Sequence, residues 1–519
     1  MFRNVILVLT AVLAAFGASV PPSDTDAWVA RAMKEFDVPG VALAVIKDGK
    51  PVLVRGYGVR KLGDSAAVDA NTLFGIASNS KAFTATALAI LVDEGKISWD
   101  DPVQKHLPTF ATWDPWVSRE VTIRDLLCHR IGLGLGAGDL LFWPDTDVTR
   151  EQVVSATRWI RPTTSFRSKY AYNNLAFVVA GEVVRAVSGK PWDQFVRERI
   201  FTPVGMSGSQ ITTLGFRPGD NVAAPHSRGW RLEGALTPIP ATKDDTWAAA
   251  AGVKSNLLDL TKWVSAHLNQ GKVDGKQVWS EKAEYEMQSP QTIINIPREG
   301  PAALRPLRAN FSAYGLGFSL RDYKGRKIVS HGGALTGMLT TIYMIPQENL
   351  GIVVLTNQEE GGLMSSVVWH IVDHYLDQPS TDWIGAFKTS RTEMLKRAND
   401  AEKKLDVGRA KASKPSLPLS GFAGTWSDAW YGKATLAVDG SRLVLRMART
   451  PAMVADLEQW QHNTFRAVFR DKTVPDAFVT FGLDAKGKPV EMKMEAVSSL
   501  ADFSFDYGDL LFRPEPAAK

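Results

Sequence analysis

One serine and one lysine stand three residues apart at the start of an apolar segment. Ser78 is followed by Lys81, and no other serine of the chain has a lysine at this spacing. Residues 82–92 repeat apolar side chains every three or four positions, which predicts a buried helix. Residues three apart share a helix face, so the hydroxyl and the amine are predicted to be neighbours in its first turn. This arrangement has the chemistry of an activated nucleophile; the alternative is a serine that only caps the helix, and partners elsewhere in the chain must decide between the two.

A tyrosine and an asparagine precede a second apolar helix, predicted over 175–187. Tyr172 and Asn174 form the single Tyr-x-Asn of the chain. Side chains at this place point out of the end of a helix, where they can meet a substrate. The alternative is a polar turn, because asparagine favours turns.

Three strand-like runs follow at 315–320, 327–333 and 340–345, and residues 351–356 complete an antiparallel meander. The second run ends in His331-Gly332-Gly333. Adjacent glycines in a strand let another backbone or a ligand approach closely.

Bulk properties exclude several classes of function. The 519 residues predict more than one domain, and 45% apolar with 22% charged residues is an ordinary globular composition. The formal charge of +5 comes from scattered residues, so no nucleic-acid partner is predicted. Cys128 is the only cysteine, which excludes an intramolecular disulfide and a cysteine zinc cluster. No His-Glu-x-x-His occurs, and neither a metal nor another cofactor is predicted.

The first 19 residues are typical of a secretory signal. Arg3 is followed by an apolar run over 5–16, too short to span a bilayer, and then by small residues. We expect a periplasmic or secreted protein with no stable membrane span after cleavage; the alternative is an uncleaved anchor.

The sequence also predicts elements outside the three motifs. A hairpin is predicted from 41–46 and 52–54 around Asp48-Gly49, a primed-turn signal. The glycine-rich run 132–138 is predicted to be a loop that lines a cleft. A charged helix over 383–405 leads to a proline-containing linker at 411–420. The short strands beyond it predict a small antiparallel barrel without catalytic residues.

The motifs Ser78-x-x-Lys81, Tyr172-x-Asn174 and His331-Gly332-Gly333 occur in the order and rough spacing of a known family. The chain resembles the β-lactamase-related serine hydrolases, which include penicillin-binding proteins, class C β-lactamases, esterases and D-aminopeptidases. The likeness covers about residues 25–378. It implies an α+β fold, in which an antiparallel sheet flanked by helices lies beside an all-helical part.

The predicted domains are a signal peptide at 1–19, the hydrolase domain at 20–380, a connecting helix and linker at 381–416, and a β-domain at 417–519. The C-terminal part resembles the small β-domain appended to some of these hydrolases. A chain ending near Ser380 is therefore expected to fold and to keep the active serine.

The resemblance also implies roles for the site residues. Ser78 is acylated, and burial lowers the pKa of Lys81 so that it shares the serine proton. Tyr172, as phenolate or through Lys81, acts as general base and then protonates the leaving group. Asn174 holds the substrate amide, and His331 orients the substrate or tunes Tyr172. The backbone N–H groups of Ser78 and Ala334, next to Gly332 and Gly333, form the oxyanion hole.

The implied activity is hydrolysis of ester or peptide-like amide bonds through an acyl-enzyme, on a small ester, a peptide or a peptidoglycan-like substrate. His331 stands where lactamases carry lysine, which weakens the pairing with a β-lactam carboxylate. Lowering the pH toward 6 is expected to restore that pairing by protonating His331.

His129 and Arg130 stand where relatives usually have a small hydroxyl residue. The alternatives are a class C-like β-lactamase, a D-Ala-D-Ala carboxypeptidase, and an inactive penicillin-binding-like binding module. The oligomeric state is not predicted.

Overall fold

The computed structural model describes residues 20–211, 217 and 219–516, so the predicted signal segment lies outside the described residues. Within that part of the chain, no helix combines the length and the apolar character that a membrane crossing requires.

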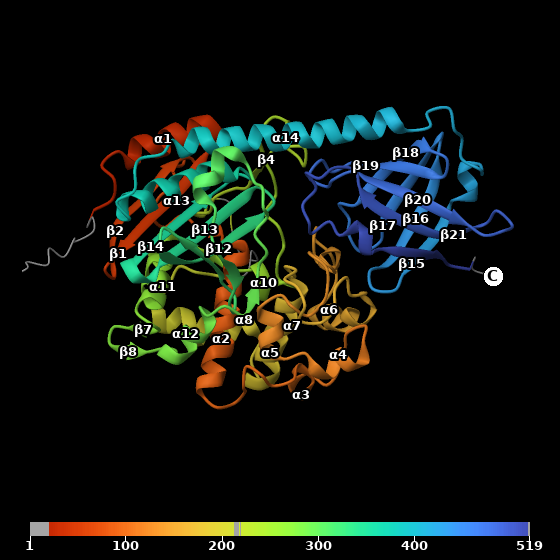
Figure 1. Cartoon of the computed structure of the whole chain (residues 1–519). Coiled ribbons are helices and arrows are strands. Elements are labelled where there is room, and N and C mark those ends of the chain that lie inside the picture. The colour runs from red at the N-terminus through yellow and green to blue at the C-terminus, as the bar shows by residue number, and fades with distance from the viewer. Residues whose placement is uncertain (1–19, 212–216, 218, 517–519) are drawn as a thin grey trace, which may run out of the picture.

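An antiparallel sheet of eight strands forms the centre of the larger domain (Figure 1). Its order is β2-β1-β14-β13-β12-β11-β10-β9. The bounds are β1 Gly40–Lys47, β2 Lys50–Gly58, β9 Thr292–Ile293, β10 Ser312–Tyr314, β11 Ser319–Tyr323, β12 Arg326–Leu335, β13 Met338–Ile345 and β14 Leu350–Thr356.

The predicted hairpin is the β1–β2 pair. Asp48 and Gly49 both have positive φ, at 53° and 74°, which matches the twist of a two-residue primed turn. Strand β1 is apolar on both faces because both are covered. Val41, Leu43 and Val45 join one apolar cluster, whereas the alternate residues join another.

Helices cover the two faces of the sheet. On one face lie α1 (Thr25–Phe36) and α13 (Gly361–Tyr375), with α14 (Trp383–Gly408) passing over them (Figure 1). On the other lies α11 (Leu257–Leu268), and the helix predicted after Ser78 is α2 (Ser80–Asp93). Phe83 of α2 stacks on Trp263 of α11 at 3.9 Å between ring centroids, which ties α2 to the sheet.

A helical part lies beside the sheet. Its longest member, α7, matches the helix predicted over 175–187. The helices are α3 Val103–His106, α4 Pro115–Glu120, α5 Ile123–Leu127, α6 Arg150–Ala156, α7 Leu175–Ser188, α8 Trp192–Val196, α9 Thr202–Val204, α10 Ala248–Ala251 and α12 Glu281–Met287. The predicted α+β fold, with an antiparallel sheet beside an all-helical part, is confirmed.

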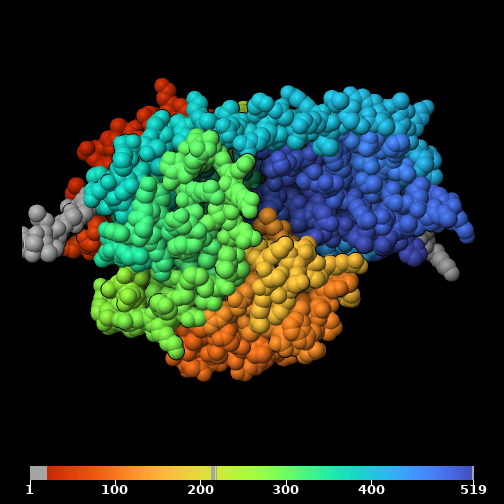
Figure 2. Space-filling model, in the orientation of Figure 1, coloured from red at the N-terminus to blue at the C-terminus, as the bar shows by residue number. Residues whose placement is uncertain are grey.

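The C-terminal strands close into an antiparallel barrel, as predicted. The strands are β15 Gly424–Asp428, β16 Gly432–Asp439, β17 Arg442–Met447, β18 Val454–Gln461, β19 Thr464–Phe469, β20 Ala477–Leu483, β21 Pro489–Ala496 and β22 Leu511–Pro514. Helix α14 spans from the sheet to the barrel, and the barrel rests against the helical part (Figures 1 and 2). The apolar interior of the barrel is continuous with that of the larger domain.

Candidate active site

Ser78 lies in a tight turn between strand and helix. It belongs to the 3₁₀ turn Ala77–Asn79, which runs directly into α2, and Ala77 has a φ of 50°, a left-handed value that is rare outside glycine. Asn79 Nδ2 donates to Thr340 Oγ1 at 3.0 Å, and that hydroxyl donates to the Ile76 carbonyl at 3.0 Å. These contacts fasten the serine turn to β13.

Lys81 lies one helical turn from Ser78 and is completely buried. Its Nζ is 3.0 Å from Ser78 Oγ, 2.6 Å from Asn174 Oδ1 and 3.0 Å from the Ala250 carbonyl oxygen. Burial lowers the pKa of Lys81 to about 7, against a smaller opposing effect of Asp139. The resemblance implied a lysine pKa lowered by burial, and the structure buries this lysine completely.

Asn174 connects Lys81 to a second buried group. Its Nδ2 donates to Asp139 Oδ2 at 2.7 Å, so both polar ends of the amide are engaged within the protein. Asp139 Oδ2 also accepts a hydrogen bond from Ser504 Oγ at 2.8 Å. Burial raises the pKa of Asp139 to about 7. Asn174 thus holds Lys81 in place, a contact that the expected amide-holding role did not include.

Tyr172 stands beside the serine and the lysine. Burial raises its pKa well above the ordinary value, and a hydrogen bond with Ser78 opposes this rise. The Lys81 ammonium position lies 4.8 Å from the centroid of the Tyr172 ring. Tyr172 is therefore a neutral phenol at neutral pH, which leaves the lysine as the group able to accept a proton there.

His331 on β12 is buried and neutral. Its Nε2 accepts from the Tyr314 hydroxyl at 2.7 Å, and its Nδ1 donates to the Gly332 carbonyl at 2.5 Å. Burial lowers the pKa of His331 to about 3, with a smaller contribution from Lys81. His331 thus presents no positive charge to the site near pH 7.

Gly333 lets β12 lie close against the serine turn. A Cβ on Gly333 would lie 2.2 Å from the Ile76 carbonyl oxygen, so only glycine fits there. Strand β11 begins opposite Ser330, which leaves residues 331–335 paired only with β13. Along the edge of β12 that β11 leaves unpaired, the backbone N–H and C=O groups of alternate residues can then face a substrate. Gly332 and Ala334 are exposed there and line the pocket.

The pocket over Ser78 has a volume of about 550 Å³. It brings together all of the predicted site residues except Lys81, which is buried beneath it. Its apolar lining includes Trp143, Trp230, Trp247, Phe503 and Phe505. Its lining among the described residues includes two acids, Glu359 and Asp502, and neither lysine nor arginine.

The barrel contributes one wall of this pocket, which the sequence analysis did not predict. The segment 500–505, between β21 and β22, lines it together with Thr473 and Pro475. The Phe503 ring meets the Tyr172 ring edge-on at 5.8 Å between centroids. The Gly138 backbone N–H donates to Asp506 Oδ2 at 2.6 Å. No catalytic-type motif marks these barrel residues, because their importance comes only from where the barrel docks.

The glycine-rich run also differs from its predicted role. A Cβ on Gly136 would lie 2.4 Å from the Phe503 carbonyl oxygen, at a backbone φ of 72°. The run lies beneath the barrel segment and does not line the pocket. Its glycines allow two backbones to approach each other.

The unusual pair His129-Arg130 has a structural explanation. His129 is buried with a φ of 59°, and its ring lies 4.3 Å from the Tyr172 ring. Its Nδ1 accepts from the Asn173 backbone N–H at 3.0 Å, and burial lowers its pKa well below the ordinary value. The neighbour Arg130 turns away from the site.

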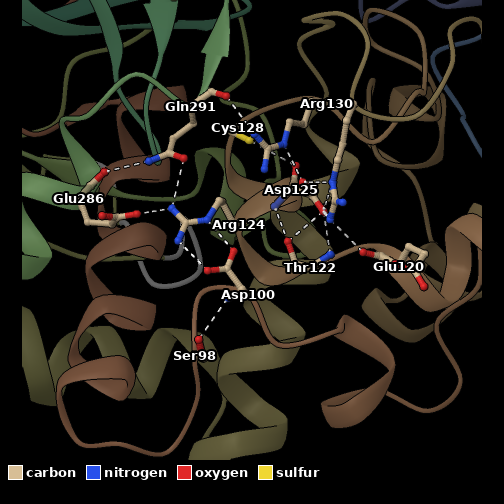
Figure 3. A network of polar contacts seen from close by, with 11 residues as sticks. Ser98, Asp100, Glu120, Thr122, Arg124, Asp125, Cys128, Arg130, Glu286 and Gln291 are labelled. Carbon is tan, nitrogen blue, oxygen red and sulfur yellow. Dashed lines mark hydrogen bonds and ion pairs between the residues drawn. The ribbon is translucent and has the colours of Figure 1, made fainter.

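Arg130 belongs to a polar network behind the pocket, drawn in Figure 3. Its Nε donates to the buried Asp125 at 2.6 Å, and its Nη1 donates to the Gln291 carbonyl at 2.9 Å. Arg124 in turn pairs with Asp100 and Glu286. The network joins α5 to the segment that leads into β9 and so fixes the loop that carries His129. Among the described residues, no group of three or more His, Cys, Asp or Glu could hold a metal ion.

Known protein families match most of this chain. Residues 25–374 match the family model "Beta-lactamase", and residues 408–514 match a domain of unknown function, DUF3471. The chain is 27% identical to "Unguisins hydrolase ungD'" of Aspergillus campestris, over 80% of this chain and 78% of the relative. It is 25% identical to the "D-aminopeptidase" of Brucella anthropi, over 82% of this chain and 76% of the relative.

A solved structure shares the fold. The octameric penicillin-binding protein homologue from Pyrococcus abyssi superposes with a TM-score of 0.60 at 22% identity, over 94% of this chain and 99% of that chain. The family match covers well over half of the chain, so this protein belongs to the Beta-lactamase family of serine hydrolases.

Proposed function

We propose that this protein hydrolyses ester or peptide-like amide bonds through an acyl-enzyme on Ser78, outside the cytoplasm. The observation that carries the proposal is the set of three contacts made by Lys81 Nζ. A neutral amine has two N–H bonds and one lone pair. Asn174 Oδ1 and the Ala250 carbonyl accept the two N–H bonds, which directs the lone pair at the Ser78 hydroxyl 3.0 Å away.

The proposed reaction consists of acylation of Ser78 followed by hydrolysis of the acyl-enzyme. Lys81 takes the Ser78 proton as Oγ attacks the substrate carbonyl, and backbone N–H groups of the serine turn and β12 stabilise the oxyanion. Tyr172, a phenol in contact with Ser78, passes a proton from Lys81 to the leaving amine or alcohol. In deacylation, Lys81 takes a proton from water as the water oxygen attacks the acyl carbonyl. The bond between the carbonyl carbon and Ser78 Oγ then breaks, Oγ regains the proton, and the acid product leaves.

The lining of the pocket supports the substrate class. A β-lactam carboxylate would meet neutral His331 and two acids, and no arginine among the described lining residues replaces the missing lysine. Neutral esters and amides with apolar groups would contact the aromatic walls. The names of two relatives, a hydrolase and an aminopeptidase, point the same way. Extracellular action is supported by the predicted signal at residues 1–19.

The test is labelling with a fluorophosphonate, followed by a substrate screen. We expect the parent and Ser98→Ala, which changes an exposed serine beyond α2, to be labelled, and Ser78→Ala not to be labelled. A nitrophenyl ester, a D-amino-acid amide and a chromogenic cephalosporin are then compared by kcat/KM. An unlabelled parent would favour the inactive binding module, and a cephalosporin turned over faster than the ester would favour the β-lactamase alternative.

A further inference from the structure

A second hollow lies on the side of the sheet opposite Ser78. Its volume is about 740 Å³, within the range of small-molecule sites. Tyr343 of β13 contributes to it, and this residue packs in the cluster below α13, whereas Ile342 beside it faces the Ser78 side. The hollow shares no lining residue with the pocket over Ser78.

The charges around this hollow are unbalanced. Four arginines line it, Arg298, Arg305, Arg308 and Arg321, against one acid, Glu299. Many arginines elsewhere in the described chain pair with a carboxylate, as Arg326 pairs with Glu348. Within the described residues, the guanidinium groups of Arg298, Arg305 and Arg308 have neither a hydrogen bond nor an ion pair. Positive charges gathered without acids favour an anion from solution.

Arg321 is held in place without an acid. It donates from Nη2 to the Leu307 carbonyl, and its guanidinium lies 5.4 Å from the centroid of the Trp369 ring. Its Nε is buried and has no partner. A backbone acceptor and an aromatic ring fix the position of this cation but do not neutralise it. Its charge therefore remains available at the hollow.

The rest of the lining is flat and apolar. The Tyr343 and Trp369 rings meet edge-on at 5.8 Å between centroids, and Phe387 of α14 adds a third ring. Trp369 is already buried, but an inorganic ion would leave the half-buried Tyr343 and Phe387 rings in contact with water. A ligand with an aromatic or acyl body and one acidic group would contact the rings and the arginines together.

We propose that this hollow, named here the arginine hollow, binds a soluble organic anion that carries a carboxylate, sulfonate or phosphate on an apolar body. Arg321 and the arginines of the segment 298–308 contact the acidic group, and Tyr343, Trp369 and Phe387 contact the body. The site is separate from the serine chemistry, so its test does not depend on the proposed hydrolysis.

The probe is 1-anilinonaphthalene-8-sulfonate, titrated by fluorescence and calorimetry on the full chain, with uncharged N-phenyl-1-naphthylamine as its neutral counterpart. We expect Arg305→Ala/Arg308→Ala to weaken sulfonate binding about tenfold or more, because two charge-assisted contacts are lost. Both side chains are exposed, so the fold should tolerate the change. Arg326→Ala, outside the hollow, is the matched control and should bind within about twofold of the parent.

A second variant tests the contribution of the Arg321 charge. Arg321→Met keeps an apolar contact with Trp369 and removes the charge, and it should also weaken the sulfonate selectively. The neutral probe should bind all of these proteins alike. Unchanged sulfonate affinity in the double variant, or an equal loss for the neutral probe, would overturn the proposal.

Discussion

At the scale of the residue, the proposed mechanism makes the reactivity of Ser78 depend on the protonation state of Lys81. Burial lowers the lysine pKa to about 7, and only the neutral amine, present above that value, accepts the serine proton. We therefore expect kcat/KM for a neutral ester to rise with pH through about 7.

Lys81→Ala should lower kcat/KM on the order of a thousandfold, since base and nucleophile act as a unit. Lys169→Ala, which changes an exposed lysine on the segment before Tyr172, is the control and should retain the parent profile. A Lys81→Ala variant that keeps most of its activity would assign the base elsewhere.

His331 changes one expectation drawn from the sequence. A free histidine titrates near pH 6.5, which suggested that mild acid would improve β-lactam binding. Burial instead lowers the pKa of His331 to about 3, and its two nitrogens are engaged with Tyr314 and the Gly332 carbonyl. The expectation of a pH effect near 6 was wrong because it took the histidine to be solvated.

The corrected prediction is that KM for a chromogenic cephalosporin does not fall between pH 7.5 and pH 6. The measurement is a series of initial rates at constant ionic strength, with a nitrophenyl ester as the reference substrate. A KM that improves severalfold for the cephalosporin alone would show that His331 gains its proton near pH 6.

At the scale of the element, the barrel segment 500–505 is connected to the buried Lys81 through three hydrogen bonds. Ser504 donates to Asp139, Asn174 donates to the same carboxylate oxygen, and Lys81 donates to Asn174. The Ser504 hydrogen bond lowers the Asp139 pKa, and the Asp139 charge raises the Lys81 pKa.

Removing the Ser504 hydroxyl should therefore act on the lysine. In Ser504→Ala the Asp139 pKa rises, its negative charge is reduced near pH 7, and the Lys81 pKa falls. We expect the rising limb of the pH–rate profile to move to lower pH, with kcat reduced severalfold by looser placement of Asn174. Ser441→Ala, in the exposed turn between β16 and β17, is the control. If the rising limb of the Ser504→Ala profile stays in place or moves to higher pH, the coupling between Ser504 and Lys81 is contradicted.

At the scale of the whole molecule, local patterns predicted the elements but not how the barrel meets the site. The Asp48-Gly49 turn and the helix after Ser78 follow from short-range geometry, and the structure has both. Asp139 and Ser504 carry no motif and lie far from Asn174 in sequence. Asp139 meets Asn174 within the hydrolase domain, whereas Ser504 reaches Asp139 only when the barrel docks. The sequence showed that His129 departs from the family pattern. Its contact with Tyr172 could not be predicted, because it depends on a loop that the Asp125–Arg130 ion pair holds in place.

The packing of helix α14 changes the prediction for a shortened chain. From the sequence, a protein ending near Ser380 was expected to fold and keep its active serine. The structure places Trp383 and Ile384 of α14 in the apolar cluster below α13, and Trp383 Nε1 donates to Asp373 Oδ2 at 2.8 Å. A chain over 20–380 loses these buried contacts, so we expect it to melt well below the parent or to aggregate.

A chain over 20–409 keeps α14 and tests the barrel alone. We expect it to fold, because the α14 contacts with the sheet domain remain, but to lose at least tenfold in kcat/KM for the ester. Without the barrel, Asp139 loses Ser504, the Gly138 backbone N–H loses Asp506, and the pocket loses the wall that includes Phe503. Circular dichroism and thermal melting establish folding, and fluorophosphonate labelling reports the serine separately from turnover. Adding a separately expressed barrel over 410–516 should restore part of the lost activity if it docks as in the full chain. A folded 20–409 protein with the kcat/KM of the parent would show that the barrel is dispensable for the site.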